Sequence, residues 1–208
     1  MKDLSMERRT VAKLPLIVFL CLLFPTVVLS VQWYTTTLNI TVKRVYYLHR
    51  TDLSSITPAG KIMNTTRPPS SLSETTLHIT RGGSVYFYTP QLSSWSLESG
   101  TWVLYIWAST VSSGNVSRLT VRIDVVSSDG STEKAVIGSI TDVIIDYGYS
   151  ERTITISGSA VNISSTDRIR LILHAQTGSE NDAEGINFYY DGYGTYQTLY
   201  HETRLQLP

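Results

Sequence analysis

The stretch RLTVRIDV, Arg118 to Val125, decides the fold because apolar and polar side chains alternate along it without interruption. Successive side chains of a β-strand point to opposite faces, so this pattern predicts a strand with one buried face and one face in water. The segment LNITVKRVYYLH, residues 38–49, begins with the same alternation. The apolar positions of the two segments are Leu119, Val121, Ile123 and Val125, and Leu38, Ile40 and Val42.

The stretch WVLYIWA, Trp102 to Ala108, is apolar on both faces. It predicts a central strand covered on both sides, with its large aromatic residues in the core: Trp102, Tyr105 and Trp107. Beyond residue 31, short segments of alternating or apolar character recur between turns rich in Gly, Ser, Asp and Asn. About ten short strands at this spacing predict an all-β fold, a two-sheet antiparallel β-sandwich similar to a jelly roll.

The uncharged run LPLIVFLCLLFPTVVLS, residues 14–30, follows four basic residues at the start of the chain. The run is at the lower limit of length for crossing a bilayer, and Pro25 near its end is typical of a signal peptide. Residues 1–30 are therefore predicted to be a signal peptide cleaved after Ser30, with an uncleaved signal anchor as the alternative. In both cases the basic flank stays inside and the remainder is exported, to the extracellular space or the cell surface.

The charge balance argues against a nucleic-acid partner. The 208 residues include 17 Lys and Arg and 17 Asp and Glu, so the formal net charge is zero. The single cysteine, Cys21, lies in the leader, and Leu20 before it does not fit a lipoprotein cleavage site. A cleaved chain would have no cysteine, so core burial rather than disulfides is expected to stabilise it.

Four acceptor motifs for N-glycosylation agree with export: Asn39, Asn64, Asn115 and Asn162. Four regions are expected along the chain: the leader 1–30, an N-terminal strand segment 31–50, a connection 51–74 and a β-sandwich domain 75–208. A strand from residues 38–48 would complete the sandwich. The connection is rich in Pro, Ser and Thr, and irregular connections of this length are usually functional or mobile.

Catalytic signatures are missing from the sequence, which has no HExxH, no GxSxG, no Walker loop and no Cys pair for zinc. The carboxylates are scattered, without the close pair that a glycosidase uses. The four histidines are far apart in the sequence, and all lie in predicted strands: His49, His78, His174 and His201. The chain is therefore not expected to be an enzyme.

Calcium is the one candidate cofactor. The acidic loop SENDAEG, residues 179–185, offers hard oxygen ligands of the kind that Ca²⁺ prefers, on Glu180, Asp182 and Glu184. The alternative is a solvated hairpin tip, because EF-hand-like spacing is missing. Asp191 ends the apolar strand INFYYD, where it would hold a structural calcium or form an Asx turn.

Aromatic residues in or beside predicted loops are candidates for contact with a ligand. They are Trp95, Tyr147, Tyr149, Tyr193 and Tyr196. Exposed flat rings stack on sugars and anchor other partners. The stretch FYYDGYGTYQTLYH, residues 188–201, contains two of them at a turn around Gly194.

Several segments together resemble an exported archaeal β-sandwich surface module, similar to the jelly rolls of carbohydrate-binding modules. They are VYYLHRTDLSSI, LHITRGGSVYFYTPQL, SGTWVLYIWAST, RLTVRIDVVSSDGS, RIRLILHAQ and NFYYDGYG, within residues 43–208. The resemblance implies that an Asp at the end of a late strand holds a structural calcium, and Asp191 matches that place. Asp52 is the candidate for its acidic partner from an early strand.

The order of leader, short strand, Pro-rich connection and single sandwich also resembles archaeal thread-type pilins, whose subunits donate an N-terminal strand to a neighbour. The segment VQWYTTTLNITV, residues 31–42, would be such a donor. The alternative is that it pairs within its own domain.

We therefore expect a non-catalytic, exported cell-surface glycoprotein with a structural or adhesive role. A pilin-like filament subunit and a carbohydrate-binding module are the alternatives. The expected partners are further copies of the chain, other surface proteins or a polysaccharide. Contact with a membrane is expected only through an uncleaved leader, residues 14–30.

Overall fold

The computed structural model describes residues 44–69, 72, 75–111, 116–177, 184–192 and 202–208. They belong to one compact unit, Thr41–Pro208, and the preceding unit is Met1–Ile40. In the part of the chain that the structure describes, no helix has the length and hydropathy that a membrane crossing requires. The predictions that fall outside the described residues concern the leader 1–30, the segment 31–42, Asn39, Asn115, Glu180, Asp182, Tyr193, Tyr196 and His201.

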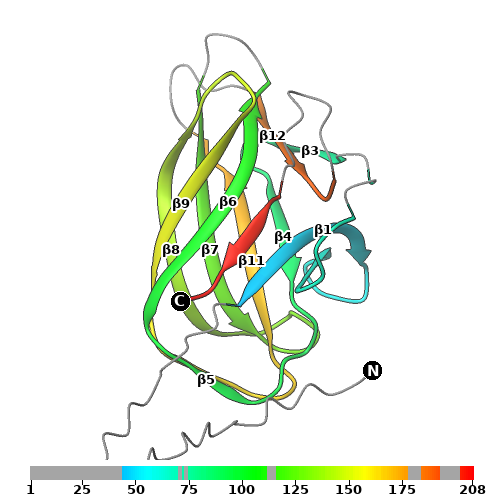
Figure 1. Ribbon diagram of the computed structural model, residues 1–208, viewed down its shortest axis with the longest axis vertical. Helices are drawn as coiled ribbons and strands as arrows, with labels where there is room; N and C mark the ends of the chain where they lie inside the picture. The colour runs from blue at the N-terminus through cyan, green and yellow to red at the C-terminus, as the bar shows by residue number, and fades with distance from the viewer. Residues whose placement is uncertain (1–43, 70–71, 73–74, 112–115, 178–183, 193–201) are drawn as a thin grey trace, which may run out of the picture. The chain divides into compact units, whose positions relative to one another are not determined.

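The described residues form strands and no helix, which confirms the predicted all-β class (Figure 1). In chain order the strands are β1 (Val45–Leu53), β2 (Gly60–Asn64), β3 (Thr75–Thr80), β4 (Ser84–Tyr88), β5 (Trp95–Leu97), β6 (Gly100–Thr110), β7 (Ser117–Val126), β8 (Glu133–Ile145), β9 (Ser150–Gly158), β10 (Val161–Ile163), β11 (Arg168–Ala175), β12 (Gly185–Tyr190) and β13 (Arg204–Gln206).

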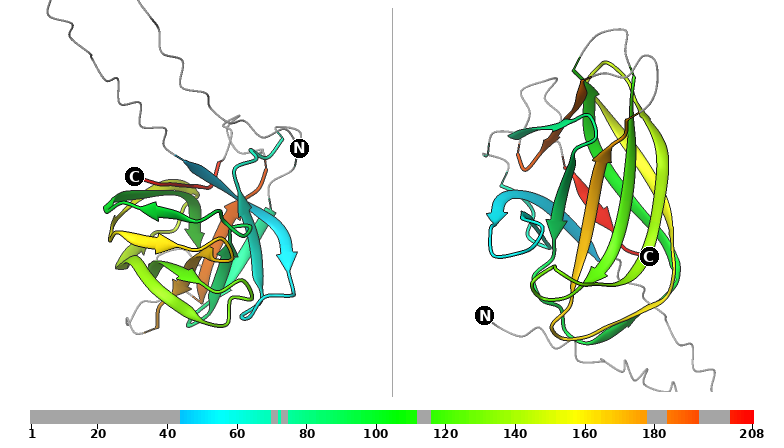
Figure 2. Two further views of the ribbon diagram at one scale, coloured as in Figure 1. Left: turned by 90° about the horizontal axis from the view of Figure 1, so that it is seen from below. Right: turned by 180° about the vertical axis from the view of Figure 1, so that it is seen from behind.

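Hydrogen bonding joins most strands into one 11-stranded sheet, while β10 and β5 form a separate two-stranded sheet. The large sheet runs in the order β3-β12-β6-β13-β1-β2-β4-β11-β7-β8, with β9 on the other edge of β6. Figure 2 shows β11 between β4 and β7 in the view from behind. A short parallel ladder between β2 and β4 joins two antiparallel parts, so the sheet is mixed and the predicted division into two antiparallel sheets does not describe its hydrogen bonding.

Strand β6 is central, with paired neighbours on both edges, but the predicted cover of both its faces is incomplete. It lies between β9 and β13 in Figure 1, and its last residues pair with β12. Trp102 is fully buried. Tyr105 and Trp107 are only partly buried. Because they have the opposite parity in the strand, they point away from the core, and the prediction that placed them in the core was wrong.

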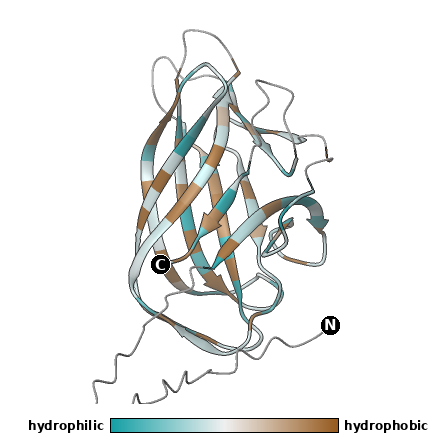
Figure 3. Ribbon diagram, viewed as in Figure 1, coloured by the Kyte–Doolittle hydropathy of each residue, from teal (hydrophilic) through white to brown (hydrophobic). Residues whose placement is uncertain are grey.

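The alternation in β7 produces the buried face that it predicted. Its apolar side chains are at most 1 % exposed: Leu119, Val121, Ile123 and Val125. Bands of opposite hydropathy alternate along the long strands in Figure 3. The core is built by such faces from strands distant in the sequence, including Phe87 of β4 and Leu205 of β13. Burial of apolar area is therefore the main stabilising term.

Strands β8 and β9 approach each other, although β8 forms its ladder with β7 and β9 forms its ladder with β6. The N–H of Ser159 donates to the carbonyl of Ile137 at 2.8 Å. A Cβ added at Gly138 would lie 2.4 Å from the carbonyl oxygen of Ser157. Glycine at this position permits the close approach of the two backbones. The large sheet is therefore curved, with β8 in contact with β9.

The Pro-rich connection 51–74 contains strand β2, which the sequence analysis did not predict. Another part of it packs on the sheet, where Ile56 forms a small apolar cluster with Tyr88 and Val126. The hydroxyl of Tyr88 donates to the carbonyl of Pro58 at 2.8 Å. The composition of this connection suggested irregular structure, but it contains a strand and a segment packed on the sheet.

Candidate functional site

Asp191 has an unusual backbone and a buried carboxylate. It follows β12 with φ of 56° and is 5 % exposed. Its Oδ1 lies 2.9 Å from Nδ1 of His49 in β1. Its Oδ2 accepts the main-chain N–H of Arg50 at 2.9 Å, and the Arg50 guanidinium lies 3.8 Å away. The carboxylate therefore closes a contact between the end of β12 and the middle of β1.

The other ring nitrogen of His49 also faces oxygen acceptors. Nε2 lies 3.0 Å from Oδ1 of Asn64 and 3.0 Å from the carbonyl of Thr66. The N–H of Thr66 donates to the same Asn64 oxygen at 2.7 Å, which identifies that atom as an acceptor. Nε2 must therefore carry a hydrogen. We call His49, Asn64, Thr66 and Asp191 the His49 cluster.

In the His49 cluster, Asp191 and His49 are paired as in a catalytic Asp–His dyad. The other ring nitrogen, Nε2, is not available as a base, however. In catalytic dyads the second imidazole nitrogen accepts a proton from a nucleophile or water. Here two acceptors hold that nitrogen as a donor. The cluster instead ties β1 to the ends of β2 and β12.

The two acids proposed as calcium ligands, Asp191 and Asp52, have different partners. Asp52 is 77 % exposed at its side chain and pairs with Lys61 at 2.7 Å, whereas the donors around Asp191 are His49 and Arg50. Burial, followed by the charges of both acids, raises the pKa of the Tyr190 phenol. Among the described residues no three His, Cys, Asp or Glu side chains are placed to hold a metal ion. Glu184, from the predicted acidic loop, is exposed.

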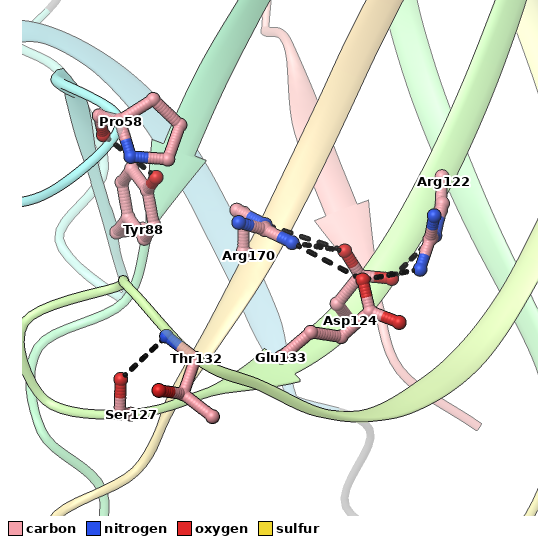
Figure 4. A network of polar contacts seen from close by, with 8 residues as sticks. All are labelled: Pro58, Tyr88, Arg122, Asp124, Ser127, Thr132, Glu133 and Arg170. Carbon is pink, nitrogen blue, oxygen red and sulfur yellow. Dashed lines mark hydrogen bonds and ion pairs between the residues drawn. The ribbon is translucent and has the colours of Figure 1, made fainter.

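A second buried charge network lies on β7, β8 and β11 (Figure 4). The fully buried carboxylate of Asp124 accepts from Arg170 at 2.7 Å and from Arg122 at 2.7 Å. Glu133 lies 2.5 Å from Arg122 and 3.6 Å from Arg170. Burial lowers the pKa of Arg170, but the hydrogen bond and charge of Asp124 outweigh it, so the net shift is upward. The network is a structural ion cluster in which each charge has a partner.

Three partly exposed aromatic rings meet on the side of β6 that faces away from the core. The ring centroids of Trp107 and Tyr149 are 5.1 Å apart, and those of Tyr149 and Tyr189 are 4.6 Å apart. The hydroxyl of Tyr189 lies 3.1 Å from the hydroxyl of Ser109. We call Trp107, Tyr149 and Tyr189 the aromatic platform. Of these three residues, only Tyr149 was predicted to face a ligand. Trp107 is an odd number of residues from the buried Trp102, so alternation along the strand already indicates that it points away from the core.

The other predicted aromatic residues in the described part do not join this platform. Trp95 of β5 is stacked under Arg44, with Cζ 4.2 Å from the ring centroid. Tyr147 is 60 % exposed and follows Asp146, whose carbonyl accepts the N–H of Thr110 at 3.1 Å. Trp95 precedes β6 and Tyr147 lies beside its last residue, so about 34 Å of strand separates them. The structure therefore divides the predicted ligand-facing rings between the two ends of β6.

Two of the four glycosylation acceptors lie in the described residues. Asn162 of β10 is exposed, and its Oδ1 accepts the hydroxyl of Ser96 at 2.5 Å. Asn64 is partly buried, and its Oδ1 belongs to the His49 cluster. The Asn162 side chain is therefore the more accessible acceptor.

The comparison with known proteins supports the fold. No protein-family model matches the chain, and no curated protein matches it. A CocE/NonD family hydrolase from Staphylococcus aureus superposes with a TM-score of 0.56 at 12% identity, over 80% of this chain and 36% of the hydrolase. An aminopeptidase from a marine sediment Thaumarchaeota archaeon superposes with a TM-score of 0.54 at 11% identity, over 81% of this chain and 37% of that chain.

This chain thus spans little more than a third of the length of these enzymes. The similarity is to their β-sheet parts, and at such low identity it shows the fold alone. The class that fold and comparisons define is an all-β domain.

Proposed function

We propose that this chain is a non-catalytic, exported cell-surface glycoprotein with a structural or adhesive role. The observation that carries the proposal is the position of the exposed apolar side chains. Most of the strongly exposed large apolar side chains of the described part lie at the Thr110 end of β6. This end of the domain offers a contact surface for a partner.

Close backbone contacts occupy the Gly100 end of β6. The N–H of Leu207 donates to the carbonyl of Arg44 at 2.9 Å. A Cβ added at Gly100 would lie 2.5 Å from Cβ of Pro208. Arg44, Leu207 and Pro208 therefore pack together at this end.

The Thr110 end of β6 carries three of the four large apolar side chains that are strongly exposed among the described residues. Their exposed fractions are 38 % for Val111, 50 % for Ile144 and 60 % for Tyr147. Val111 and Tyr147 each follow one partner of the hydrogen bond between Thr110 and Asp146. We call these three residues the apical cluster. Exposed apolar side chains at one end of a domain are candidates for contact with a partner.

The polar groups also support a role without catalysis. His49, Asp191, Asp124 and Arg170 each have partners from strands distant in the sequence. Such contacts stabilise the fold. Four acceptor motifs support glycosylation of an exported chain.

The finer architecture that we propose is a two-layer sandwich similar to a jelly roll. The approach of β8 to β9 supports it, because it places β8 against the β6–β9 part of the sheet. The hydrogen-bonded continuity through β2 and β4 is compatible with two layers that share one corner.

The proposal is tested by the binding of the full-length chain, labelled with a fluorophore, to intact cells of the organism that makes it. A variant with Val111→Ser, Ile144→Ser and Tyr147→Ser removes the apical cluster. The matched control is Val136→Ser, because Val136 is 44 % exposed on β8 and lies about 27 Å from Ile144 along the strand. Equal binding of both variants and the wild type would overturn an adhesive apical cluster.

Electron microscopy of the same samples addresses the filament alternative. Filaments that disappear when residues 31–42 are deleted would favour a pilin-like subunit that donates this segment. A folded monomer without filaments before and after the deletion favours the adhesive role.

A further inference from the structure

We infer that a cavity between β2 and the start of β11 binds a carboxylate that carries an apolar group. The cavity has a volume of about 260 Å³. Its lining residues are Leu53, Ile62, Pro90, Gln91 and Arg168. Among these described residues three are apolar, and Arg168 supplies a positive charge. The cavity is separate from the apical cluster, so the inference goes beyond the proposed adhesive role.

The cavity is built by segments that are distant in the sequence. Leu53 ends β1, and Ile62 lies in β2, which a parallel ladder joins to β4. Arg168 begins β11 and pairs with Val126, the last residue of β7. The other end of β7 pairs with Ile144 of the apical cluster, about 27 Å away along the strand. A ligand in the cavity therefore does not touch the apical cluster.

The Arg168 guanidinium is held in place by only part of its hydrogen-bonding capacity. Its Nε donates to the carbonyl of Ser128 at 2.8 Å, and its Nη1 donates to the carbonyl of Thr89 at 2.7 Å. A guanidinium has five N–H donors, so three of them, including both on Nη2, have no partner among the described residues. Adjacent N–H groups of Nη1 and Nη2 match the two oxygens of a carboxylate.

The positive charge of Arg168 has no carboxylate partner in the described part of the chain, since its two acceptors are neutral carbonyl groups. Burial lowers the pKa of its guanidinium, and no described carboxylate offsets this effect. Burial acts on Arg170 in the same way, but Asp124 outweighs it there. Asp124 and Glu133 pair with Arg122 and Arg170. An external anion would therefore complete the charge balance at Arg168.

The size and the walls of the cavity limit the kind of anion that fits. Its volume equals that of about nine water molecules in the liquid, which suits a single amino-acid residue or an organic acid of similar size. Leu53 and Ile62 are only partly buried, so an apolar group of the ligand would cover them. One cation between apolar walls favours a carboxylate over a phosphate group, which carries nearly two negative charges. The ligand is a small organic acid or the C-terminal residue of a peptide.

Saturation-transfer NMR of the full-length chain tests the inference with N-acetyl-L-leucine as the probe. This molecule has a carboxylate and an apolar side chain, and we expect a Kd of about 1 mM for a ligand of this size. The matched probe is N-acetyl-L-leucinamide, which has the same side chain but no charge. It should bind at least about tenfold more weakly, because it cannot pair with the guanidinium.

Two variants connect the binding to the cavity. Arg168→Gln should abolish it, but this change also removes two hydrogen bonds to main-chain carbonyls. Gln91→Glu avoids that loss, because Gln91 is exposed and the new carboxylate competes with the ligand for Arg168. It should weaken binding by about fivefold or more without lowering the melting temperature. The control is Arg118→Gln, which changes an arginine at the other end of β7 and should bind as the wild type does.

Equal binding of the acid and the amide, or unchanged binding by Gln91→Glu, would overturn the inference. So would the absence of a signal from the wild type at about 10 mM acid. A short peptide that ends in leucine separates the two sources of the carboxylate. Tighter binding than that of the free acid identifies a chain terminus, and equal binding identifies a small acid. The apical-cluster variant should bind the acid as the wild type does, so a failure of this site and a failure of the adhesive role are distinguished.

Discussion

The imidazole of His49 and the carboxylate of Asp191 lie 2.9 Å apart although 142 positions separate them in the sequence. The contact joins β1 to the end of β12, which β13 and β6 separate in the sheet order. Asp191 makes it from a left-handed backbone conformation that is unfavourable for a side chain with Cβ. The surrounding hydrogen bonds must therefore compensate for the conformational cost.

Replacing Asp191 by Ala should lower the free energy of unfolding by about 2 kcal/mol, because His49 and the N–H of Arg50 would lose a charged acceptor. Denaturant unfolding measures the change. The control is Asp52→Ala, which removes an exposed partner of Lys61 and should cost less than about 1 kcal/mol. Equal losses for the two variants would contradict the structural role of the His49 cluster.

A double-mutant cycle refines this test. His49→Ala and Asp191→Ala should show a coupling free energy of about 1–2 kcal/mol, since the two side chains contact each other directly. Additive effects would mean that each residue acts independently of the other.

Replacing Asp124 by Asn should destabilise the domain by about 3 kcal/mol, because the buried Arg170 would lose its nearest counter-charge and keep only the more distant Glu133. Thermal and chemical unfolding both report this loss. Asp146→Asn is the control, because Asp146 is 52 % exposed and its pairing with Arg152 is open to solvent. A comparable loss in the control would show that burial of the Asp124 network is not the decisive factor.

The pH dependence of stability should include a contribution from Asp167. Burial by itself raises the pKa of this carboxyl, but the hydrogen bond from Lys134, the N–H of Ser164 and the Lys134 charge outweigh burial and lower it. Because the pKa is lower in the folded state, Asp167 stabilises the fold above about pH 4 and loses this effect as pH falls through its folded pKa. Asp167→Asn should therefore flatten the decline in melting temperature as the pH falls below about 4. An unchanged profile would contradict this assignment.

Replacing Gly138 by Ala should destabilise the domain by about 2 kcal/mol, because the added Cβ would meet the carbonyl of Ser157. Val136→Ala, two residues away on the same strand, shortens an exposed side chain and should cost less than about 1 kcal/mol. Unfolding curves of the two variants compare the effects directly. A neutral Gly138→Ala would argue against close packing of β8 on β9.

The all-β class was predictable because alternation is a local property. In RLTVRIDV the apolar side chains Leu119, Val121 and Ile123 are buried as predicted. The division into sheets was not predictable, since it depends on the two-residue parallel ladder of Lys61 and Ile62 with β4. That ladder lies in a segment whose proline and serine content indicated an irregular connection.

The candidate sites were only partly predictable from the sequence. Asp191 was selected for its place after an apolar strand, but its partners His49 and Arg50 are distant in the sequence and no spacing rule identifies them. Trp107 was assigned to the core because WVLYIWA was treated as apolar on both faces. Trp107 is five residues after the buried Trp102, so the two side chains point to opposite faces of β6. Only the pairing of β6 with β12 places Tyr189 beside Trp107.

The adhesive role is decided by the binding of the labelled full-length chain to intact cells, with the apical-cluster variant and the Val136→Ser control titrated in parallel. We expect the variant with Val111→Ser, Ile144→Ser and Tyr147→Ser to bind at least about tenfold more weakly than the wild type. The control should bind as the wild type does. Identical binding curves for all three proteins would contradict an adhesive role for the Thr110 end of β6.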